Sequence, residues 1–513
     1  MNPPLKQPVA PSTKPALELI ALARLSPEVA RQNLRALLLA NPNYFGNVTG
    51  SSFKAVLNIQ EDTTYESIGA IGYDPQLERL RAIINIKRSR GYSGDITTRG
   101  SEEYVRFYLS YDDGSTWYDQ GSRAFKVFDA PGPKPLEFAV TLQITPRNKF
   151  CFVQHLARVR AILSWNSPPP AGAPNWTPVW GNVVESQIQI DGSHFILRRT
   201  ALSTDLERPE DLAHALDLEQ STEAAAPKKL SPFELHMLYA KRAVPQHRYL
   251  SPMLARAANL SGRANLSAVL SKDTNSASNA SGLDLSRLVE TWLDTRGDTA
   301  FEALSCLGFD LDTNQLTAII DIKQNAGYCG GFDTAGSNEF VAFWVDWGSG
   351  WDYAGTTSVA VHDSSPLPVR TLRYSVVLSM DLLPHRKTRK DSPHVAKVRA
   401  VLSWGTPPST TNPYARVVWG NSVEGLVLNP SKHTSALTEA GDIDLEQVRN
   451  HGNDDCITNA VTISTGARRV DTYGMGLRGH PLAIGVWDRT NVNSGQTSNY
   501  NQSSAGFCLQ TGS

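Results

Sequence analysis

The chain has 513 residues, of which 41% are hydrophobic and 19% are charged. This composition excludes an intrinsically disordered chain, and the length exceeds what one ordinary hydrophobic core holds, so several domains are expected. The formal net charge of −1 provides no overall field to attract nucleic acid or an anionic membrane, and we expect neither as a partner.

Five cysteines occur, at positions 151, 306, 329, 456 and 508. Their number is odd, no Cys-x-x-Cys pair occurs and no paired histidines complete a zinc site, so the sequence predicts no disulfide framework, no metal and no cofactor. The N-terminal residues lack an apolar segment of signal-peptide length, and no apolar run approaches the length of a membrane-spanning helix. We therefore expect a cytoplasmic protein, or one released by a non-classical route.

Residues 1–45 are predicted to form a mobile arm followed by an amphipathic helix. The first fifteen or so residues contain Pro and Lys without hydrophobic periodicity, which is typical of a mobile terminus. Ser26-Pro27-Glu28 then supplies an N-cap, a proline at the first helical position and an acid in the first turn, and Asn41-Pro42 ends the helix. An apolar helix face must dock on something, and the chain's own β domain is favoured over a partner.

Residues 46–195 are predicted to form a β domain. Seven strand-like segments occur there, at residues 66–72, 81–87, 104–111, 124–128, 136–144, 159–165 and 183–190. Short strands separated by turns such as Asp112-Asp113-Gly114 are typical of an antiparallel β-sandwich. The strand number resembles the immunoglobulin-like and fibronectin-like architecture, although the Cys and Trp spacing of antibody domains is absent.

Residues 295–430 repeat this pattern. Ala82-Ile83-Ile84 matches Ala318-Ile319-Ile320, 236 positions later. The segment Val-Arg-Ala-Ile-Leu-Ser-Trp at residues 159–165 returns with one change at residues 398–404, and a Trp-Gly-Asn triplet follows fifteen positions after the tryptophan in both copies. Fixed spacing within one chain indicates a duplicated structural unit, so we predict a mainly β protein with tandem duplicated β-sandwich domains.

The remaining segments differ in character. Residues 196–294 are predicted to be a helical connector, with short capped helices at residues 209–216 and 231–238 and a flexible linker at residues 271–282. Residues 431–513 are rich in Asn, Ser, Thr and Gly and are predicted to be a polar tail or a small β module. The basic run at residues 385–390 is interpreted as a solvated hairpin tip.

One short motif resembles a known family. Ser110-Tyr111-Asp112-Asp113-Gly114-Ser115-Thr116-Trp117 is similar to the Asp-box of sialidase-type propellers, in which the box is a β-hairpin clasp and not catalytic. The resemblance covers eight residues and implies a structural role for Asp112, Gly114 and Trp117. Residues 346–351 of the second copy lack the motif, no regular blade repeat is present, and two local acids are too few for calcium. A sialidase relation is therefore not favoured.

Two pairs of acids recur at matching positions, Glu103 with Glu339 and Glu185 with Glu424. A carboxylate pair of this kind leaves a glycoside hydrolase open as an alternative. Capping of a loop, or pairing with Arg160 or Arg399, explains the recurrence without catalysis and is favoured, so we assign no catalytic residue.

The aromatic residues give the best candidate binding site. Trp165 and Trp404 are predicted to close the two cores. Around the Pro-rich loops after them lie Trp176, Trp180, Tyr414 and Trp419. These rings either clip the loops or form a platform that stacks on a sugar or a peptide.

The favoured function is a non-enzymatic binding or assembly protein, built from two homologous β-sandwich domains and acting as a structural or interaction subunit. Its expected partner is another protein or a second copy of the chain. A carbohydrate-binding protein that uses the Trp-lined loops is the first alternative, and a glycoside hydrolase is the second.

Overall fold

The computed structural model describes residues 27–95, 98–147, 155–190, 227–255, 285–364, 370–380, 385 and 394–429, with four short strands between residues 448 and 488. Strands predominate, so the prediction of a mainly β chain is confirmed. The chain forms two compact units, one of residues 1–385 and 393–429, the other of residues 386–392 and 430–513. The predicted helix at 209–216, the linker at 271–282, the arm at 1–15 and residues 386–390 of the basic run lie outside the described residues.

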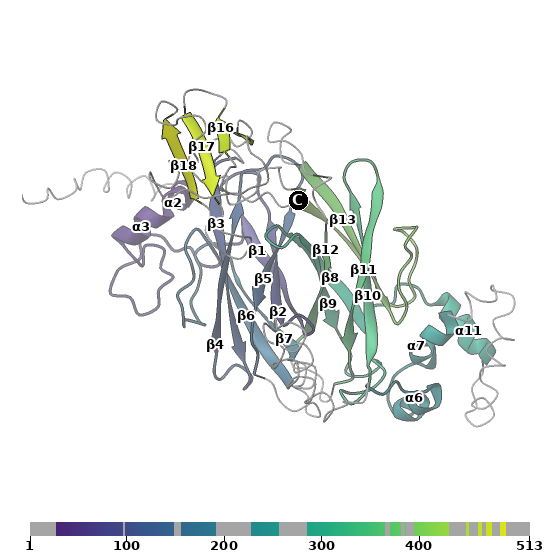
Figure 1. Cartoon of the computed structure of the whole chain (residues 1–513). Helices are drawn as coiled ribbons and strands as arrows, with labels where there is room; N and C mark the ends of the chain where they lie inside the picture. Colours follow the sequence, from purple (N-terminus) through teal and green to yellow (C-terminus); the bar gives the residue numbers. More distant parts are fainter. Residues whose placement is uncertain are drawn as a thin grey trace, which may run out of the picture. The chain divides into compact units, whose positions relative to one another are not determined.

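The described residues of the first compact unit form fourteen strands. These strands make two halves that follow one another along the chain (Figure 1). The first half consists of β1 (Glu66–Asp74), β2 (Arg79–Ile86), β3 (Ser101–Ser110), β4 (Tyr118–Val127), β5 (Leu136–Gln143), β6 (His155–Trp165) and β7 (Val183–Ile190). The second half consists of β8 (Glu302–Asp310), β9 (Gln315–Ile322), β10 (Ser337–Asp346), β11 (Trp351–Val361), β12 (Leu372–Ser379), β13 (His394–Trp404) and β14 (Ser422–Asn429).

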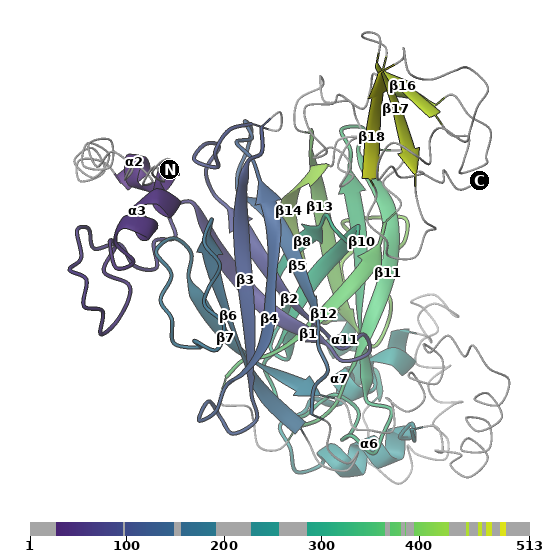
Figure 2. The ribbon, with the colours of Figure 1, turned by 60° about the vertical axis from the view of Figure 1, so that its left-hand side comes forward.

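Within each half, strand pairing follows the same order (Figure 2). Single bridges between the halves, among them Leu372 of β12 to Gln187 of β7, join ten of the strands into one sheet, whereas β11, β10, β13 and β14 form a separate sheet. The pairing of β1 with β12 closes six strands of the larger sheet into a ring. In the first half β1, β2 and β5 pair antiparallel in that order, and β7, β6, β3 and β4 form an antiparallel row of four. In the second half β8, β9 and β12 form the row of three, and β14, β13, β10 and β11 the row of four. Strand β4 begins at Tyr118, six residues before the predicted start. The prediction missed these residues because they are mostly polar, which hides the alternation of apolar and polar positions that indicates a strand.

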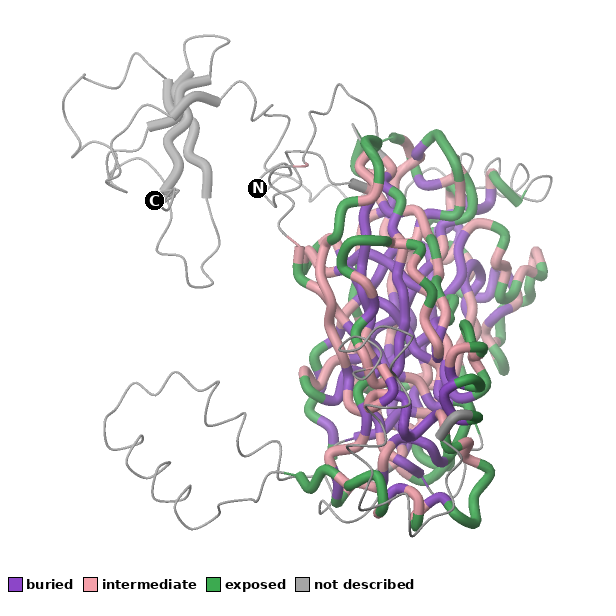
Figure 3. The backbone as a smooth tube through the Cα atoms, turned by 90° about the vertical axis from the view of Figure 1, so that its right-hand side faces the viewer, coloured by how far each residue is buried: buried purple, intermediate pink, exposed green. Residues whose placement is uncertain are grey.

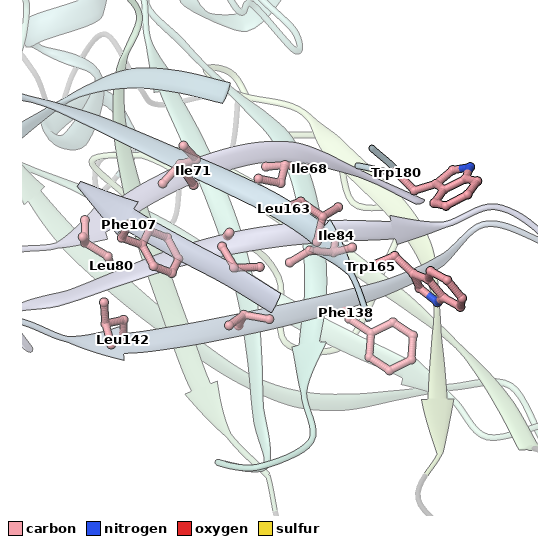
Figure 4. Close-up of a cluster of buried hydrophobic side chains, with 14 of the residues drawn as sticks. Ile68, Ile71, Leu80, Ile84, Phe107, Phe138, Leu142, Leu163, Trp165 and Trp180 are labelled. Atoms are coloured by element: carbon pink, nitrogen blue, oxygen red, sulfur yellow. The ribbon is translucent and has the colours of Figure 1, made fainter. Parts of the chain in front are cut away.

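Each half has its own hydrophobic core. The core of the first half gathers Leu80 and Ile84 from the row of three with Phe107 and Leu163 from the row of four, and the rings of Trp165 and Trp180 close one end (Figure 4). Strands β1 and β2 are buried along almost their whole length, which means that both of their faces are covered. The buried stretches of the tube in Figure 3 run through the middle of this unit.

The two rows of three meet in a contact that we call the joint. Tyr73 of β1 bridges to Tyr374 of β12, and Phe138 of β5 bridges to Phe309 of β8. Phe309 lies 236 positions after Tyr73, and Tyr374 lies 236 positions after Phe138. Each bridge therefore joins the residues that match those of the other bridge, so the joint is symmetric with respect to the two halves. Two small side chains and two isoleucines fill it: Ala70, Ala139, Ile83 and Ile319.

Glycine makes the close approach in the joint possible. A Cβ atom on Gly72 would lie 2.8 Å from the Tyr374 carbonyl oxygen, and one on Gly308 would lie 2.9 Å from the Phe138 carbonyl oxygen. Atoms at such distances repel, so the two backbones need glycine to pack this closely. The two glycines lie 236 positions apart, as do the strand residues that match between the two halves.

The Trp-Gly-Asn triplets link the two rows within each half. Asn182 follows Trp180 and Gly181, and its Oδ1 accepts the Ile68 N–H of β1 at 2.7 Å. Asn421 accepts the Leu304 N–H of β8 at 2.7 Å in the same way. The side-chain amide therefore takes the place of a strand partner, and this pairing accounts for the recurrence of the motif.

Short helices accompany the strands: α2 (Pro27–Gln32), α3 (Leu34–Ala40), α6 (Pro232–Tyr239), α7 (Gln246–Tyr249) and α11 (Leu285–Asp294). The single helix predicted after Ser26 is two helices, because Asn33 interrupts it and its side-chain amide donates to the Val29 carbonyl at 2.9 Å. The helix predicted from Ser231 is α6, which begins with a capping box of Ser231 and Glu234. Among the described helices, none is long and apolar enough to span a membrane.

The second compact unit contains one described sheet. Its antiparallel strands are β15 (Val448–Asn450), β16 (Ala460–Ile463), β17 (Arg468–Tyr473) and β18 (Ala483–Asp488), paired in chain order. This sheet lies within residues 431–513, for which a polar tail or a small β module was predicted.

Candidate binding surface

A buried arginine closes the core of the first half. Arg31 of α2 places its guanidinium between two rings, with Cζ 4.1 Å from the Tyr65 centroid and 4.0 Å from the Trp165 centroid. Its two terminal nitrogens donate to both oxygens of Glu66, at 2.9 and 2.7 Å. Both side chains are almost fully buried. Because a buried charge needs a close partner, this bidentate pair fixes α2 on the end of the core.

The second half has the same arrangement, in which the arginine comes from helix α7 of the segment predicted to be the connector. Arg248 of α7 lies between the rings of Phe301 and Trp404, at 4.1 and 4.2 Å from their centroids. It donates to both oxygens of Glu302 at 2.9 and 2.6 Å. We call these two arrangements the arginine cages. The two helices that carry the arginines have little sequence similarity to each other. The repeat in the sequence therefore does not predict the cages.

The cages also place the predicted core tryptophans and two predicted binding residues. Trp165 and Trp404 are buried against the arginines. Trp180 and Trp419 are only 1% and 2% exposed, and they lie next to the same guanidinium groups. A ring buried in this way offers no face to a ligand, so the expectation that Trp180 and Trp419 form a binding platform is corrected to a role in the core.

Beside each cage lies a second buried acid, Glu103 in the first half and Glu339 in the second. Burial raises the pKa of both carboxyl groups well above the usual range, and the neighbouring Glu66 or Glu302 raises it further. Both carboxyl groups are fully buried, so no solvent reaches them. This position separates Glu103 and Glu339 from any substrate.

The other recurring acids do meet those arginines. Glu185 accepts from Arg160 Nε at 2.8 Å and from Arg158 at 2.6 Å, and Arg370 of the second half lies 3.0 Å away. Glu424 pairs with Arg399. The arginines hold the pKa of Glu185 below its usual value despite its partial burial, so it stays ionised as an ion-pair partner.

The Asp-box residues form the turn between β3 and β4. Asp112 Oδ1 accepts the Thr116 N–H and the Ser110 hydroxyl, both at 2.8 Å, and Ser110 Oγ accepts the Gly114 N–H at 2.7 Å. Hydrogen bonds from Thr116 and Ser110 lower the pKa of Asp112 to about 2. Trp117 packs under Arg160, with Cζ 4.3 Å from its ring. This network makes the motif a clasp for the hairpin.

Exposed aromatic side chains gather on the second half. Tyr414 is 59% exposed and Tyr353 is 39% exposed, and Trp351 is half-buried beside them. Trp351 Nε1 donates to Tyr414 Oη at 2.8 Å, which holds the two rings together. We call Trp351, Tyr353 and Tyr414 the aromatic ledge.

The aromatic ledge rests on the outer face of the row of four. Tyr353 of β11 lies opposite Trp344 of β10 and packs edge-on against it at 5.2 Å. Arg399 of β13 follows in the same row, with Cζ 4.7 Å from the Tyr414 ring, and its Nε donates to the Pro413 carbonyl at 2.8 Å. The rings are thus held in place before any ligand arrives, which lowers the entropic cost of binding.

The matching face of the first half is covered. Tyr108 stands where the second half has Trp344, and it is fully buried, with its hydroxyl donating to the Pro170 carbonyl at 3.0 Å. Asp119 replaces Tyr353, accepts the Gly172 N–H at 2.7 Å and pairs with Arg106. The Pro-rich loop therefore lies on this face, and Trp176 within it is half-buried.

Of the four predicted binding aromatics, only Tyr414 belongs to the aromatic ledge. Trp351 and Tyr353 were missed, although residues 351 and 353 alternate along a strand that starts just after the glycines of a turn. That alternation was the available signal, because alternate residues of an edge strand face the same side. Across the described residues, no three His, Cys, Asp or Glu side chains lie close enough together to hold a metal ion.

No protein-family model matches the sequence, and no curated protein matches it. Similar solved structures include the crystal structure of CBD12 from CALX1.2, at 7% identity over 66% of this chain and 79% of that chain, with a TM-score of 0.15. MtrC from Shewanella baltica OS185 has 10% identity over 71% and 70%, with a TM-score of 0.14. The BSP domain of a biofilm associated protein has 8% identity over 88% and 64%, with a TM-score of 0.15. Superpositions this poor carry no argument about fold or function.

Proposed function

We propose that this chain is a non-enzymatic assembly protein, in which two copies of an immunoglobulin-like β-sandwich form one scaffold that associates with other protein chains. The equal order of strand pairs in the two halves supports the duplication, as does the regular offset between matching residues, which is 236 up to Glu103 and Glu339 and 239 at Trp165 and Trp404. The row of three and the row of four in each half enclose one core, which supports the sandwich.

The joint is the observation that carries the assembly proposal. Arg81 of β2 is fully buried there, and its Nη1 lies 3.4 Å from Asp74 and 3.4 Å from Ser375 of the other half. Thr141 of the first half donates to Asp310 of the second at 2.5 Å. Polar contacts that cross the joint, such as those of Arg81 with Ser375 and of Thr141 with Asp310, favour one relative position of the two halves. A scaffold of fixed geometry suits a protein whose surfaces must meet other subunits in register.

Light scattering over a hundredfold range of protein concentration tests the assembly proposal. The chain has a mass of 56.1 kDa, and an assembly protein is expected to show a larger mass that falls on dilution. A mass that stays at the monomer value over the whole range contradicts the proposal that the chain assembles with itself.

The aromatic ledge favours a second candidate function, the binding of carbohydrate. Exposed, preorganised rings stack on the apolar faces of sugars, and the paired charges of Arg399 and Glu424 beside Tyr414 supply hydrogen-bonding groups. Tryptophan fluorescence titrated with a panel of oligosaccharides should show saturable binding that Tyr414→Ala abolishes. Asn175→Ala is the matched control, because Asn175 occupies the corresponding loop position of the first half. Equal binding by Tyr414→Ala and the parent protein would exclude the ledge.

A further inference from the structure

Strand β11 lies at the end of a sheet, and no described strand hydrogen-bonds to one of its two backbone edges. Within the part of the chain that the structure describes, β11 pairs with β10 only, over ten residue pairs, and its other edge has no strand partner. Strand β4 has the corresponding place in the first half and pairs with β3 only. A long open edge is a template for another strand, and monomeric proteins protect such edges with charges, bulges or proline.

The two edge strands differ in this protection. Both contain a bulge at the same place, so the bulge does not distinguish them. Strand β4 carries Arg123 and Lys126, and Arg123 lies opposite the core residue Val105, so its charge stands on the inner side of the edge. Thr357 and Ala360 occupy the matching positions of β11. Strand β11 therefore lacks the charges that protect β4.

The charge pattern of β11 also suits pairing with itself. Its one charged residue is Asp352, the second of its eleven residues. An antiparallel pair of β11 strands centred on Thr356 sets each Asp352 opposite Ala360 of the other copy, so the two carboxylates lie at opposite ends. Thr356 then lies opposite Thr356 of the other copy, and a cross-strand threonine pair is favourable.

We propose that β11 pairs antiparallel with β11 of a second copy of this chain, so that two rows of four join into one eight-stranded sheet. The inference rests on the proposed assembly function and names its partner. A second copy brings an identical open edge, so one two-fold contact covers both edges, whereas a foreign peptide would leave its own outer edge exposed.

A charged variant of β11 tests the pairing. Thr357 and Val359 lie opposite Val341 and Glu339, which face the core, so Thr356 and Ser358 face the outer side. The double variant Thr356→Lys and Ser358→Lys puts like charges on both strands of the pair without entering the core. We expect its dimer dissociation constant in sedimentation equilibrium to rise at least tenfold.

The matched control is Ser122→Lys with Ala124→Lys, which makes the same change at the corresponding positions of β4. The control should dimerise as the parent protein does, and far-ultraviolet circular dichroism should show that both variants are folded. A parent protein that associates while the β11 variant associates equally well overturns the β11 contact but leaves the assembly function standing. A parent protein that stays monomeric overturns both the β11 contact and the assembly of the chain with itself.

Hydrogen exchange provides a second readout on the unmodified chain. Amides of residues 351–361 should exchange several-fold more slowly at a concentration where the dimer forms than at a concentration where it dissociates, because pairing gives the free N–H groups a partner. Amides of residues 118–127 should exchange at equal rates at both concentrations. Equal rates for residues 351–361 under conditions in which the mass doubles would place the dimer contact elsewhere and overturn the proposal.

Discussion

The outer faces of the two rows of four differ, although the strands beneath them match pair for pair. In the first half a Pro-rich loop covers the face and binds Tyr108 and Asp119, whereas in the second half Tyr353 and Tyr414 stay exposed. The edge strands differ in the same sense, because β4 carries charges that β11 lacks. The buried arginine cages, by contrast, are nearly the same. The two halves thus share the contacts that hold each core and differ in the surfaces that they expose.

The largest expected effect comes from the arginine cages. Arg31→Ala leaves Glu66 buried without its charge partner, and Arg248→Ala does the same to Glu302. Loss of one partner of a buried pair costs about 3–5 kcal/mol of unfolding free energy. Urea denaturation followed by tryptophan fluorescence measures it for each variant. A second substitution, Glu66→Gln, in the Arg31→Ala background should recover part of the loss. If either arginine variant loses less than about 1 kcal/mol, the two cages are not equivalent.

A smaller effect is expected at the joint. Gly72→Ala and Gly308→Ala each push a methyl group against a backbone carbonyl of the other half, and such overpacking costs about 1–3 kcal/mol. Thermal unfolding should show similar losses for the two variants, because the joint is symmetric. Gly331→Ala is the control, since a Cβ there meets no atom closer than 3.3 Å. Unequal losses at Gly72 and Gly308 would show that one half dominates the joint.

The smallest expected effect is a pH dependence of the unfolding free energy. It comes from Glu137 of the first half, which has no matching acid in the second half. Burial raises the pKa of Glu137 to about 7, while its Oε2 accepts the Leu426 N–H of the second half at 2.5 Å. Arg373 stands at the matching position and pairs with Asp321 instead. A carboxyl group whose folded pKa is raised stabilises the fold below its unfolded pKa, and this contribution is lost as the pH rises towards 7.

We therefore expect the unfolding free energy of the parent protein to fall by about 1 kcal/mol between pH 4.5 and pH 7 relative to Glu137→Gln, after an allowance for partial solvent screening. Urea titrations of both proteins at several pH values measure this difference. Parallel pH profiles for the two proteins would show that Glu137 does not titrate in this range.

The repeated architecture could be predicted from local patterns in the sequence. The offset of 236 between Ile83 and Ile319 identified the matching strands, because alternating apolar residues and turn residues are local signals. The clasp at Asp112 followed for the same reason, since all its hydrogen bonds lie within seven residues of one another. These features needed no knowledge of what lies across the fold.

Only the tertiary structure decided which residues are enclosed and which are exposed. Arg31 meets Glu66 across 35 positions and Arg248 meets Glu302 across 54, and no local pattern pairs an arginine on a short helix with a distant strand. Trp180 and Trp419 are buried because they belong to those cages. Tyr353 is exposed, whereas a Pro-rich loop covers its counterpart Asp119 in the first half. Alternation shows that a strand has two faces, but the segment that covers each face is chosen by long-range packing, which a single sequence does not display.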